Sequence, residues 1–149
     1  MSTLYKEKDL LDIKMECPGE DTTYPVPRDM LRDNGTKRYA YVTLVMQGDS
    51  YVSGAMVLGY SLRQLNTQAD LVVLVTNDVS QDAVEILKIY YDQVKLVPYI
   101  ELMNWRTKKQ THRMYLNYVF TKFHLFNLTE YDKVLLIDAD AIILQHPDH

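Results

Sequence analysis

The sequence has a single cysteine, Cys17, among its 149 residues. One cysteine cannot form a disulfide within the chain, and this is typical of proteins from a reducing compartment. The first residues, MSTLYKEKDLLDIK, are charged and lack the apolar stretch of a secretory signal. No apolar run reaches the roughly 20 residues that a membrane helix needs. We therefore expect a cytoplasmic protein with no membrane partner.

The sequence also lacks an excess of positive charge, since 16 Lys and Arg face 20 Asp and Glu. A net charge of −4 gives no electrostatic basis for nucleic-acid binding. Four nucleotide and catalytic motifs are missing: GxGxxG, the Walker A loop, GxSxG and HExxH. Their absence removes the main residues of a dinucleotide site, a P-loop, a hydrolase elbow and a zinc-protease site.

Hydrophobic periodicity is missing from residues 1–37, which hold three of the five prolines and many charges. Such a segment predicts a loosely structured lead-in. The pattern sharpens at Arg38, so we place the structured domain over residues 38–149. We see no second domain and no internal repeat.

Beyond Arg38, β-prone apolar runs alternate with helical patterns. The runs predict strands over residues 39–46, 70–77, 94–99 and 133–144, and helices over 51–65, 80–94 and 113–128. This alternation predicts an α/β fold, an open and mostly parallel sheet with flanking helices. Residues 47–50 are expected to supply a turn and a helix cap, and Ser80 to cap the next helix. Gly54 and Gly59 are expected to let their helix approach the sheet closely.

Two aspartates, Asp138 and Asp140, stand at the end of the apolar run KVLLI. In an extended segment, residues i and i+2 point the same way, about 6–7 Å apart. Two carboxylates so placed suit Mg²⁺ or Mn²⁺, which also take water and phosphate oxygens as ligands. The alternative is a strand end with two acids facing solvent.

Three other side chains leave two interpretations open. Lys122, on an apolar helix, can reach into solvent along its aliphatic stem or can contact phosphate. Arg113, at the expected start of that helix, is part of a basic surface or of an anion clamp. Tyr51, just after the first strand, is a core residue or a platform on which a base stacks.

Three stretches together resemble glycogenin-like enzymes of glycosyltransferase family 8. They are AYVTLVMQGDSYVSGAMVLGYSLRQL (40–65), LVVLVTNDVS (71–80) and TKFHLFNLTEYDKVLLIDADAIIL (121–144). The resemblance implies a GT-A fold, which is Rossmann-like, and transfer of a sugar from a UDP-sugar with retention at the anomeric carbon. It also implies dependence on Mn²⁺, for which Mg²⁺ is the alternative from the residues themselves.

For the metal and the reacting groups, the resemblance implies roles at four positions. Asp138 and Asp140 would be the metal-binding pair of the family's D-x-D motif, and both belong to the catalytic set. Ala139 between them would approach the nucleotide. Lys122 matches the family's lysine near the donor sugar and diphosphate, which favours the phosphate contact and a catalytic role.

For the nucleotide, the resemblance implies four further contacts. Leu44 and Tyr51 would hold the uracil, Tyr51 by stacking, and Arg113 would contact the donor. The turn after Leu44 is longer than in glycogenin, and Gln47 there is the expected substitute for an asparagine amide of the family.

The family continues well past its D-x-D motif, whereas this chain ends at His149. We therefore expect a fragment, truncated before the acceptor-side half of the enzyme. The resemblance implies that residues 38–149 are the nucleotide-sugar-binding half of a larger GT-A domain. The expected partners are a UDP-sugar donor and a glycan or protein acceptor, and a homodimer is allowed. Two alternatives stay open: a phosphatase of the haloacid-dehalogenase type, whose strand also ends in D-x-D, and a non-catalytic nucleotide-sugar-binding module.

Overall fold

The computed structural model describes residues 30–101 and 114–148, and a parallel sheet forms the centre of this part of the chain. The strands are β1 (Tyr39–Val45), β2 (Asp70–Val75), β3 (Gln93–Leu96) and β4 (Lys133–Leu136). They pair in the order β3-β2-β1-β4, and every pair is parallel. The prediction of an open α/β sheet with flanking helices is confirmed.

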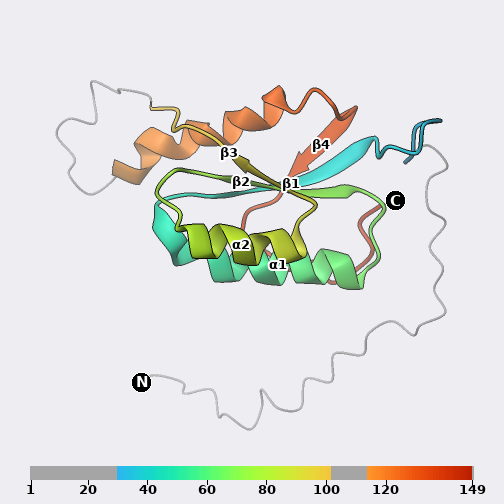
Figure 1. The fold of residues 1–149 in the computed structure, drawn as a ribbon, viewed down its shortest axis with the longest axis horizontal. Helices are drawn as coiled ribbons and strands as arrows, with labels where there is room; N and C mark the ends of the chain where they lie inside the picture. Colours follow the sequence, from blue (N-terminus) through green and yellow to red (C-terminus); the bar gives the residue numbers. More distant parts are fainter. Residues whose placement is uncertain (1–29, 102–113, 149) are drawn as a thin grey trace, which may run out of the picture.

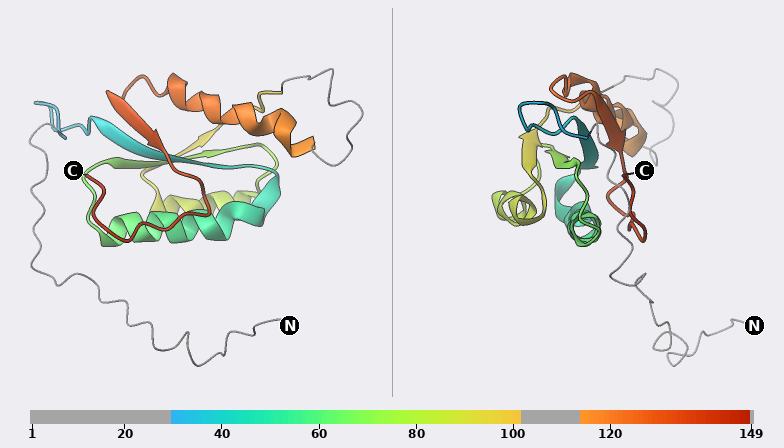
Figure 2. Two further views of the ribbon diagram at one scale, coloured as in Figure 1. Left: turned by 180° about the vertical axis from the view of Figure 1, so that it is seen from behind. Right: turned by 90° about the vertical axis from the view of Figure 1, so that its right-hand side faces the viewer.

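Helices cover both faces of the sheet (Figure 1). After the short 3₁₀ helix η2 (Gly48–Tyr51), α1 (Val52–Gln64) and α2 (Gln81–Tyr90) lie side by side on one face. The 3₁₀ helix η4 (Met114–Asn127) lies on the other, and the end view in Figure 2 shows the same layers. Within the described residues, no helix combines the length and the apolar character needed to cross a membrane.

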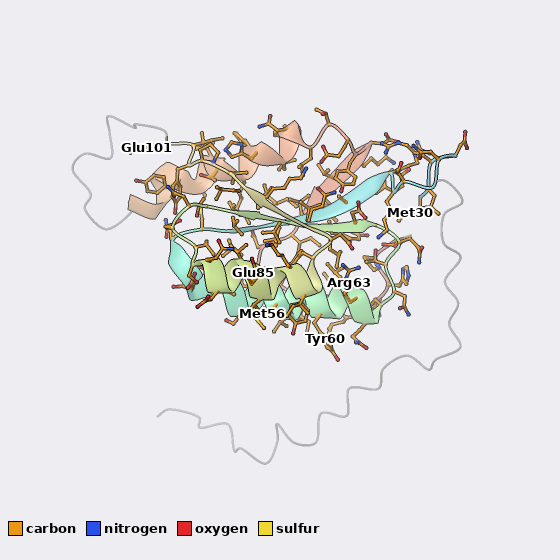
Figure 3. All side chains as sticks on the ribbon, in the orientation of Figure 1. Met30, Met56, Tyr60, Arg63, Glu85 and Glu101 are labelled. Atoms are coloured by element: carbon orange, nitrogen blue, oxygen red, sulfur yellow. The ribbon has the colours of Figure 1, made fainter. Side chains whose placement is uncertain are left out.

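The two central strands, β1 and β2, are buried on both faces, as parallel strands in α/β proteins are. Alternate residues point to opposite sides: Tyr41, Val45 and Leu71 pack towards α1 and α2, while Val42 and Leu74 belong to a second cluster on the other side. Side chains fill both spaces in Figure 3, where Tyr60, more than half exposed, lies on the outer side of α1.

The second helix and the third strand both end earlier than predicted. The second helix was expected to reach residue 94 but ends at Tyr90, because Tyr91 adopts an extended conformation. Asp92 then bonds to β2, donating its N–H to the Leu71 carbonyl and accepting the Leu71 N–H, each at 2.8 Å. This pairing starts β3 at Gln93, and β3 ends at Leu96, shortly before Pro98, which has no N–H to donate.

The fourth strand was also predicted too long, because β4 ends at Leu136 rather than at residue 144. The N–H of Ile137 still bonds to the Val42 carbonyl at 2.8 Å, and the chain then leaves the sheet. A bond from the Ala141 N–H to the Asp138 carbonyl, 3.1 Å long, closes a turn over residues 138–141, which we call the aspartate turn. The aspartates therefore lie in a turn, and the spacing argument for an extended segment does not apply.

Of the predicted lead-in, residues 1–29 lie outside the described residues. Residues 30–37 contact the domain: Leu31 and Lys37 form an antiparallel bridge, and Met30 is buried in the core beside α1 and α2. Arg32 donates to Asp132 at 2.8 Å. Where the lead-in ends and the domain begins stays a prediction.

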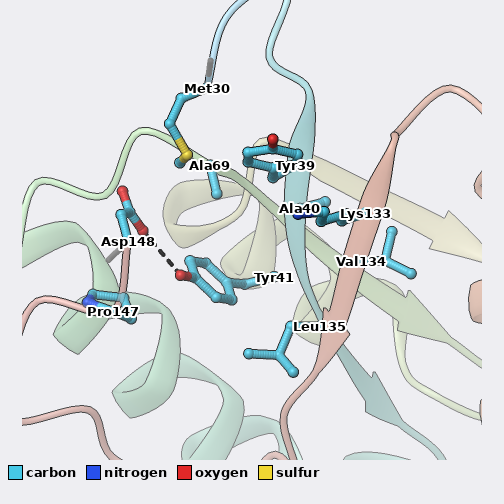
Figure 4. A pocket seen from close by; sticks show the side chains of 10 residues that line it. All are labelled: Met30, Tyr39, Ala40, Tyr41, Ala69, Lys133, Val134, Leu135, Pro147 and Asp148. Atoms are coloured by element: carbon cyan, nitrogen blue, oxygen red, sulfur yellow. Dashed lines mark hydrogen bonds between the residues drawn. The ribbon is translucent and has the colours of Figure 1, made fainter. Parts of the chain in front are cut away.

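At the amino ends of the strands, Asp148 is almost fully buried and fixes the end of the described chain. It accepts hydrogen bonds from the Tyr41 hydroxyl (2.9 Å), the Thr67 hydroxyl (2.7 Å) and the Gln68 N–H (2.6 Å). Figure 4 shows the Tyr41 hydroxyl directed at Asp148. Both residues line a pocket of about 430 Å³. Burial, together with this hydrogen bond, raises the pKa of Tyr41.

We expect the substitution Asp148→Ala to lower the free energy of unfolding by about 2 kcal/mol, because it leaves buried donors without an acceptor. Asp132→Ala is the control, since Asp132 pairs with Arg32 and Arg38 on the surface, where such pairs contribute at most about 1 kcal/mol. Chemical denaturation of both variants measures the difference. Equal losses would contradict the role given to the buried carboxylate.

Candidate functional site

A second pocket, of about 460 Å³, lies at the carboxyl ends of β1 and β4. It is lined by residues of three separate segments, namely Leu44, Met46, Gln47, Tyr51, Val119, Lys122, Asp138, Ala139 and Asp140. Seven of the eight site residues expected from the sequence are among them. The eighth, Arg113, lies outside the described residues. The roles assigned to these residues stay predictions, but the structure brings the seven together.

The pocket's position follows from the order of the strands. The chain passes from β1 to β2 and β3 on one side of β1, and then returns to place β4 on the other side. In open α/β sheets, ligands bind where the strand order reverses in this way, outside the carboxyl ends of the strands. The pocket between β1 and β4 is at this reversal.

The walls of the pocket differ in character. Leu44 is buried near the end of β1, and Tyr51 at the end of η2 leaves 50% of its side chain exposed. A half-exposed tyrosine ring beside an apolar residue offers a flat surface on which a planar group can stack. Of the two interpretations left open for Tyr51, the structure excludes a core residue.

The opposite wall carries the charged groups. Lys122 of η4 donates a hydrogen bond to Asp138, and the two form an ion pair at the pocket. Asp140 is exposed and makes no ion pair with any described residue. Among the described residues, the pocket therefore has one carboxylate paired with a lysine, that of Asp138, and one without an ion-pair partner, that of Asp140.

The aspartate turn fits a divalent cation of the Mg²⁺ type. Two exposed carboxylates supply hard oxygen ligands, and Mg²⁺ and Mn²⁺ keep several waters or phosphate oxygens. No cluster of three or more His, Cys, Asp or Glu that could hold a metal occurs among residues 30–101 and 114–148. Such a cation would thus take its remaining ligands from water, a bound phosphate or residues beyond these.

The turn between β1 and α1, residues 46–51, has an unusual backbone. Gln47 and Gly48 are both left-handed, with φ of 63° and 76°. A left-handed conformation is unfavourable for glutamine and must be held by its surroundings. The Gln47 N–H bonds to the Tyr99 hydroxyl at 2.9 Å, and the Gly48 N–H to the Asp78 carboxylate at 3.0 Å.

Asp78 anchors this turn through several donors. Besides the Gly48 N–H, it accepts hydrogen bonds from Thr76 (2.5 Å) and Tyr99 (2.8 Å). Desolvation acts to raise the pKa of Asp78, but these hydrogen bonds outweigh it and hold the pKa below its usual range. The Tyr99 ring also packs on Tyr118 of η4, with 4.6 Å between ring centroids, and so joins two walls of the pocket.

We expect Asp78→Asn to destabilise the protein by up to about 1 kcal/mol at neutral pH, since the exposed site is screened by solvent. The carboxylate binds protons more weakly in the folded state, so its contribution is present above the unfolded pKa of about 3.9 and is lost as the pH falls through the folded value. Denaturation at pH 7 and pH 3 should show the two proteins converging at low pH. A constant difference would contradict this account.

The predicted cap in residues 47–50 was wrong, because no side chain caps α1, which follows directly from η2. Asp49 instead accepts the N–H of Ser80 at 2.8 Å and ties the two turns together. The prediction for Ser80 is confirmed, since its side chain accepts the N–H of Ala83 at 3.2 Å.

Sequence reasoning missed several residues of this site. Met46 and Val119 line the pocket, while Asp78 and Tyr99 shape it from behind. The position of Asp78 just after β2 was a usable signal, because the carboxyl ends of neighbouring parallel strands meet at one edge. Nothing in the sequence marked Tyr99.

Comparison with known proteins gives one family. The model of glycosyl transferase family 8 matches residues 42–147. That range contains the seven predicted residues that line the pocket.

Individual relatives agree with this match. The chain is 40% identical to an uncharacterized protein of Acanthamoeba polyphaga mimivirus over 111 residues, 74% of this chain and 39% of that protein. It is 37% identical to UDP-glucuronate:xylan alpha-glucuronosyltransferase 2 of Arabidopsis thaliana over 130 residues, 87% of this chain and 21% of that protein. It is 37% identical to human glycogenin-1 over 109 residues, which are 73% of this chain and 31% of glycogenin-1. The matched regions are thus about a fifth to two fifths of these relatives' lengths.

Proposed function

Because the chain belongs to glycosyl transferase family 8, we propose that its pocket between β1 and β4 is the donor site of a glycosyltransferase that binds a UDP-sugar and Mn²⁺ or Mg²⁺. The whole protein would transfer a hexosyl group, with retention of anomeric configuration, to a sugar or protein acceptor. One observation carries the proposal: seven residues chosen from the sequence, far apart along the chain, line a single pocket where the strand order reverses.

The chemistry of the pocket supports a nucleoside diphosphate ligand. Tyr51 and Leu44 offer a stacking and apolar surface for a base, and Lys122 supplies a positive charge for a phosphate. A bound divalent cation would neutralise the diphosphate charge that grows as UDP departs. The name of the Arabidopsis relative specifies a UDP-linked donor, which supports uracil as the base.

The pair between Lys122 and Asp138 fixes where the lysine lies at this site. The lysine is held at the pocket by the aspartate, so it need not be recruited from solvent when a phosphate arrives. On binding, Lys122 would exchange its carboxylate partner for a phosphate, and Asp138 would then be available to hold a cation that neutralises it. A preorganised positive charge of this kind stabilises a departing phosphate more than a mobile one does.

The family match weighs against the phosphatase interpretation, because it covers the aspartate turn and the preceding strands together. A non-catalytic binding module would share the donor pocket and would differ by the absence of turnover. Release of UDP from UDP-sugars by the whole protein separates these two possibilities.

Calorimetric titration of this chain tests the proposed donor site. We expect UDP to bind more tightly with Mg²⁺ or Mn²⁺ than with EDTA, by tenfold or more, and more tightly than ADP or GDP. CDP measures how far the site distinguishes the two pyrimidines. Affinity that is unaffected by EDTA, or a preference for purine nucleotides, would contradict the proposal.

A further inference from the structure

Gly54, in the first turn of α1, lies against the aspartate turn. A Cβ atom built on Gly54 would lie 2.5 Å from the carbonyl oxygen of Ala139, 3.3 Å from its carbonyl carbon and 3.6 Å from the Cα of Asp140. All three neighbours are backbone atoms, so no side chain can rotate away to make room.

The backbone conformation of Gly54 does not itself require glycine, because the residue lies within an α-helix. Glycine is also one of the least favourable residues in a helix interior. The sequence had suggested that Gly54 and Gly59 let their helix approach the sheet. Their actual neighbours differ: Gly54 meets the aspartate turn, and Gly59 meets Tyr90 at the end of α2 and Tyr91 just after it.

The aspartate turn has little freedom to retreat from α1. Upstream, the Ile137 N–H is bonded to β1 at Val42. Downstream, the Ile143 N–H bonds to the Ser61 hydroxyl of α1 at 3.2 Å. A side chain at position 54 would therefore distort the turn between two fixed points rather than displace it as a unit.

We propose that Gly54 is a positioning residue that sets the placement of Asp138 and Asp140 at the donor site. This inference rests on the proposed function for the metal role of the turn. An alanine at this position would need roughly 1 Å more room, since ordinary contacts begin near 3.4 Å. Misplacement of that size can reduce the efficiency of a site about a hundredfold.

Gly59→Ala is a matched control, because it makes the same change in the same helix. Its Cβ would meet the Tyr90 Cβ and the Tyr91 ring at 3.0 Å, and neither tyrosine lines the pocket. Both variants replace a helical glycine by alanine and both introduce a close contact. They differ in whether that contact is with the aspartate turn.

The test combines UDP titration with amide NMR. With Mg²⁺, we expect Gly54→Ala to weaken UDP binding tenfold or more; in EDTA, where only the nucleotide contact of Ala139 is disturbed, the loss should be clearly smaller. Gly59→Ala should change neither value by more than twofold. In the ligand-free protein, the amide signals of residues 139–141 should shift in Gly54→Ala and not in Gly59→Ala.

Each other outcome overturns a specific claim. Unshifted amide signals, or unchanged Mg²⁺-dependent affinity, in Gly54→Ala would contradict the positioning role. A fold lost in Gly54→Ala and kept in Gly59→Ala would also contradict it, because the contact would then hold the fold rather than place the turn. If the UDP affinity of the wild-type chain were the same with and without Mg²⁺, the proposed function would be contradicted. The amide signals would still report whether Gly54 contacts the turn.

Discussion

Replacement of Asp140 by asparagine is expected to reduce UDP-sugar turnover by the whole protein by roughly 10²- to 10³-fold, the range seen when a group that stabilises transition-state charge is removed. Asparagine keeps the size of the side chain and removes its charge, so packing should be preserved. The effect should be large because Asp140 is the carboxylate of the pair that has no ion-pair partner among the described residues. A neutral amide is a poor replacement for a carboxylate ligand of Mg²⁺ or Mn²⁺.

The same variant should lose most of the metal dependence of UDP binding by this chain. The control is Asp132→Asn, just before the amino end of β4, where the carboxylate pairs with surface arginines. Turnover and calorimetric titrations should leave Asp132→Asn close to wild type. If Asp140→Asn kept its activity and metal dependence, the aspartate turn would not be the metal site.

Replacement of Lys122 by methionine is expected to lower turnover by about 100-fold and to weaken UDP binding about tenfold, because a positive charge beside the diphosphate is lost. Its effect on Mn²⁺ alone should have the opposite sign. Lys122 now neutralises Asp138, so its removal frees a carboxylate and should leave Mn²⁺ binding unchanged or stronger. These opposite effects on UDP and Mn²⁺ affinity distinguish Lys122→Met from Asp140→Asn, which should weaken the binding of both UDP and Mn²⁺.

Electron paramagnetic resonance of free Mn²⁺ measures the metal affinity, and calorimetry measures the UDP affinity. Lys88→Met is the control, since Lys88 pairs with Glu85 on the exposed side of α2. Loss of Mn²⁺ binding in Lys122→Met would show that the lysine supports the turn structurally, and the proposed contact with phosphate would then be unnecessary.

The central part of the fold was predictable because its residues have few alternatives. The strands over Tyr39–Val45 and Asp70–Val75 are near-continuous apolar runs, which only burial on both faces explains. Ser80 marked a helix start because its hydroxyl has one obvious use there. Where several contacts compete, as at the end of α2, the sequence pattern did not show that Asp92 would end the helix by pairing with β2.

The end of β4 shows a limit of pattern reasoning. The run KVLLIDADAIIL is apolar on both sides of its aspartates, so a long strand was expected. The apolar residues after the aspartates are buried in another way. Ile143 packs against the core beside α1, and its N–H bonds to the Ser61 hydroxyl. Hydrophobic residues gain similar free energy against a helix or within a sheet, so the pattern cannot separate the two.

Seven of the residues that line the pocket were named from the sequence, mostly through the family resemblance, whereas Met46, Val119 and the supporting contacts were not. Leu44, Tyr51 and Lys122 have no local pattern that distinguishes them from core or surface residues. The contact between Gly54 and Ala139 joins residues 85 positions apart, and only the packing reveals it.

Amide NMR of this chain, titrated with UDP and trace Mn²⁺, tests the central claim most directly, because the paramagnetic ion broadens the signals of nearby residues. We predict broadening centred on the aspartate turn and UDP-dependent shifts at Leu44, Gln47, Tyr51 and Lys122. Broadening or shifts centred instead on Tyr41 and Asp148, towards the amino ends of the strands, would contradict a donor site between β1 and β4. The absence of any broadening or shift would contradict it as well.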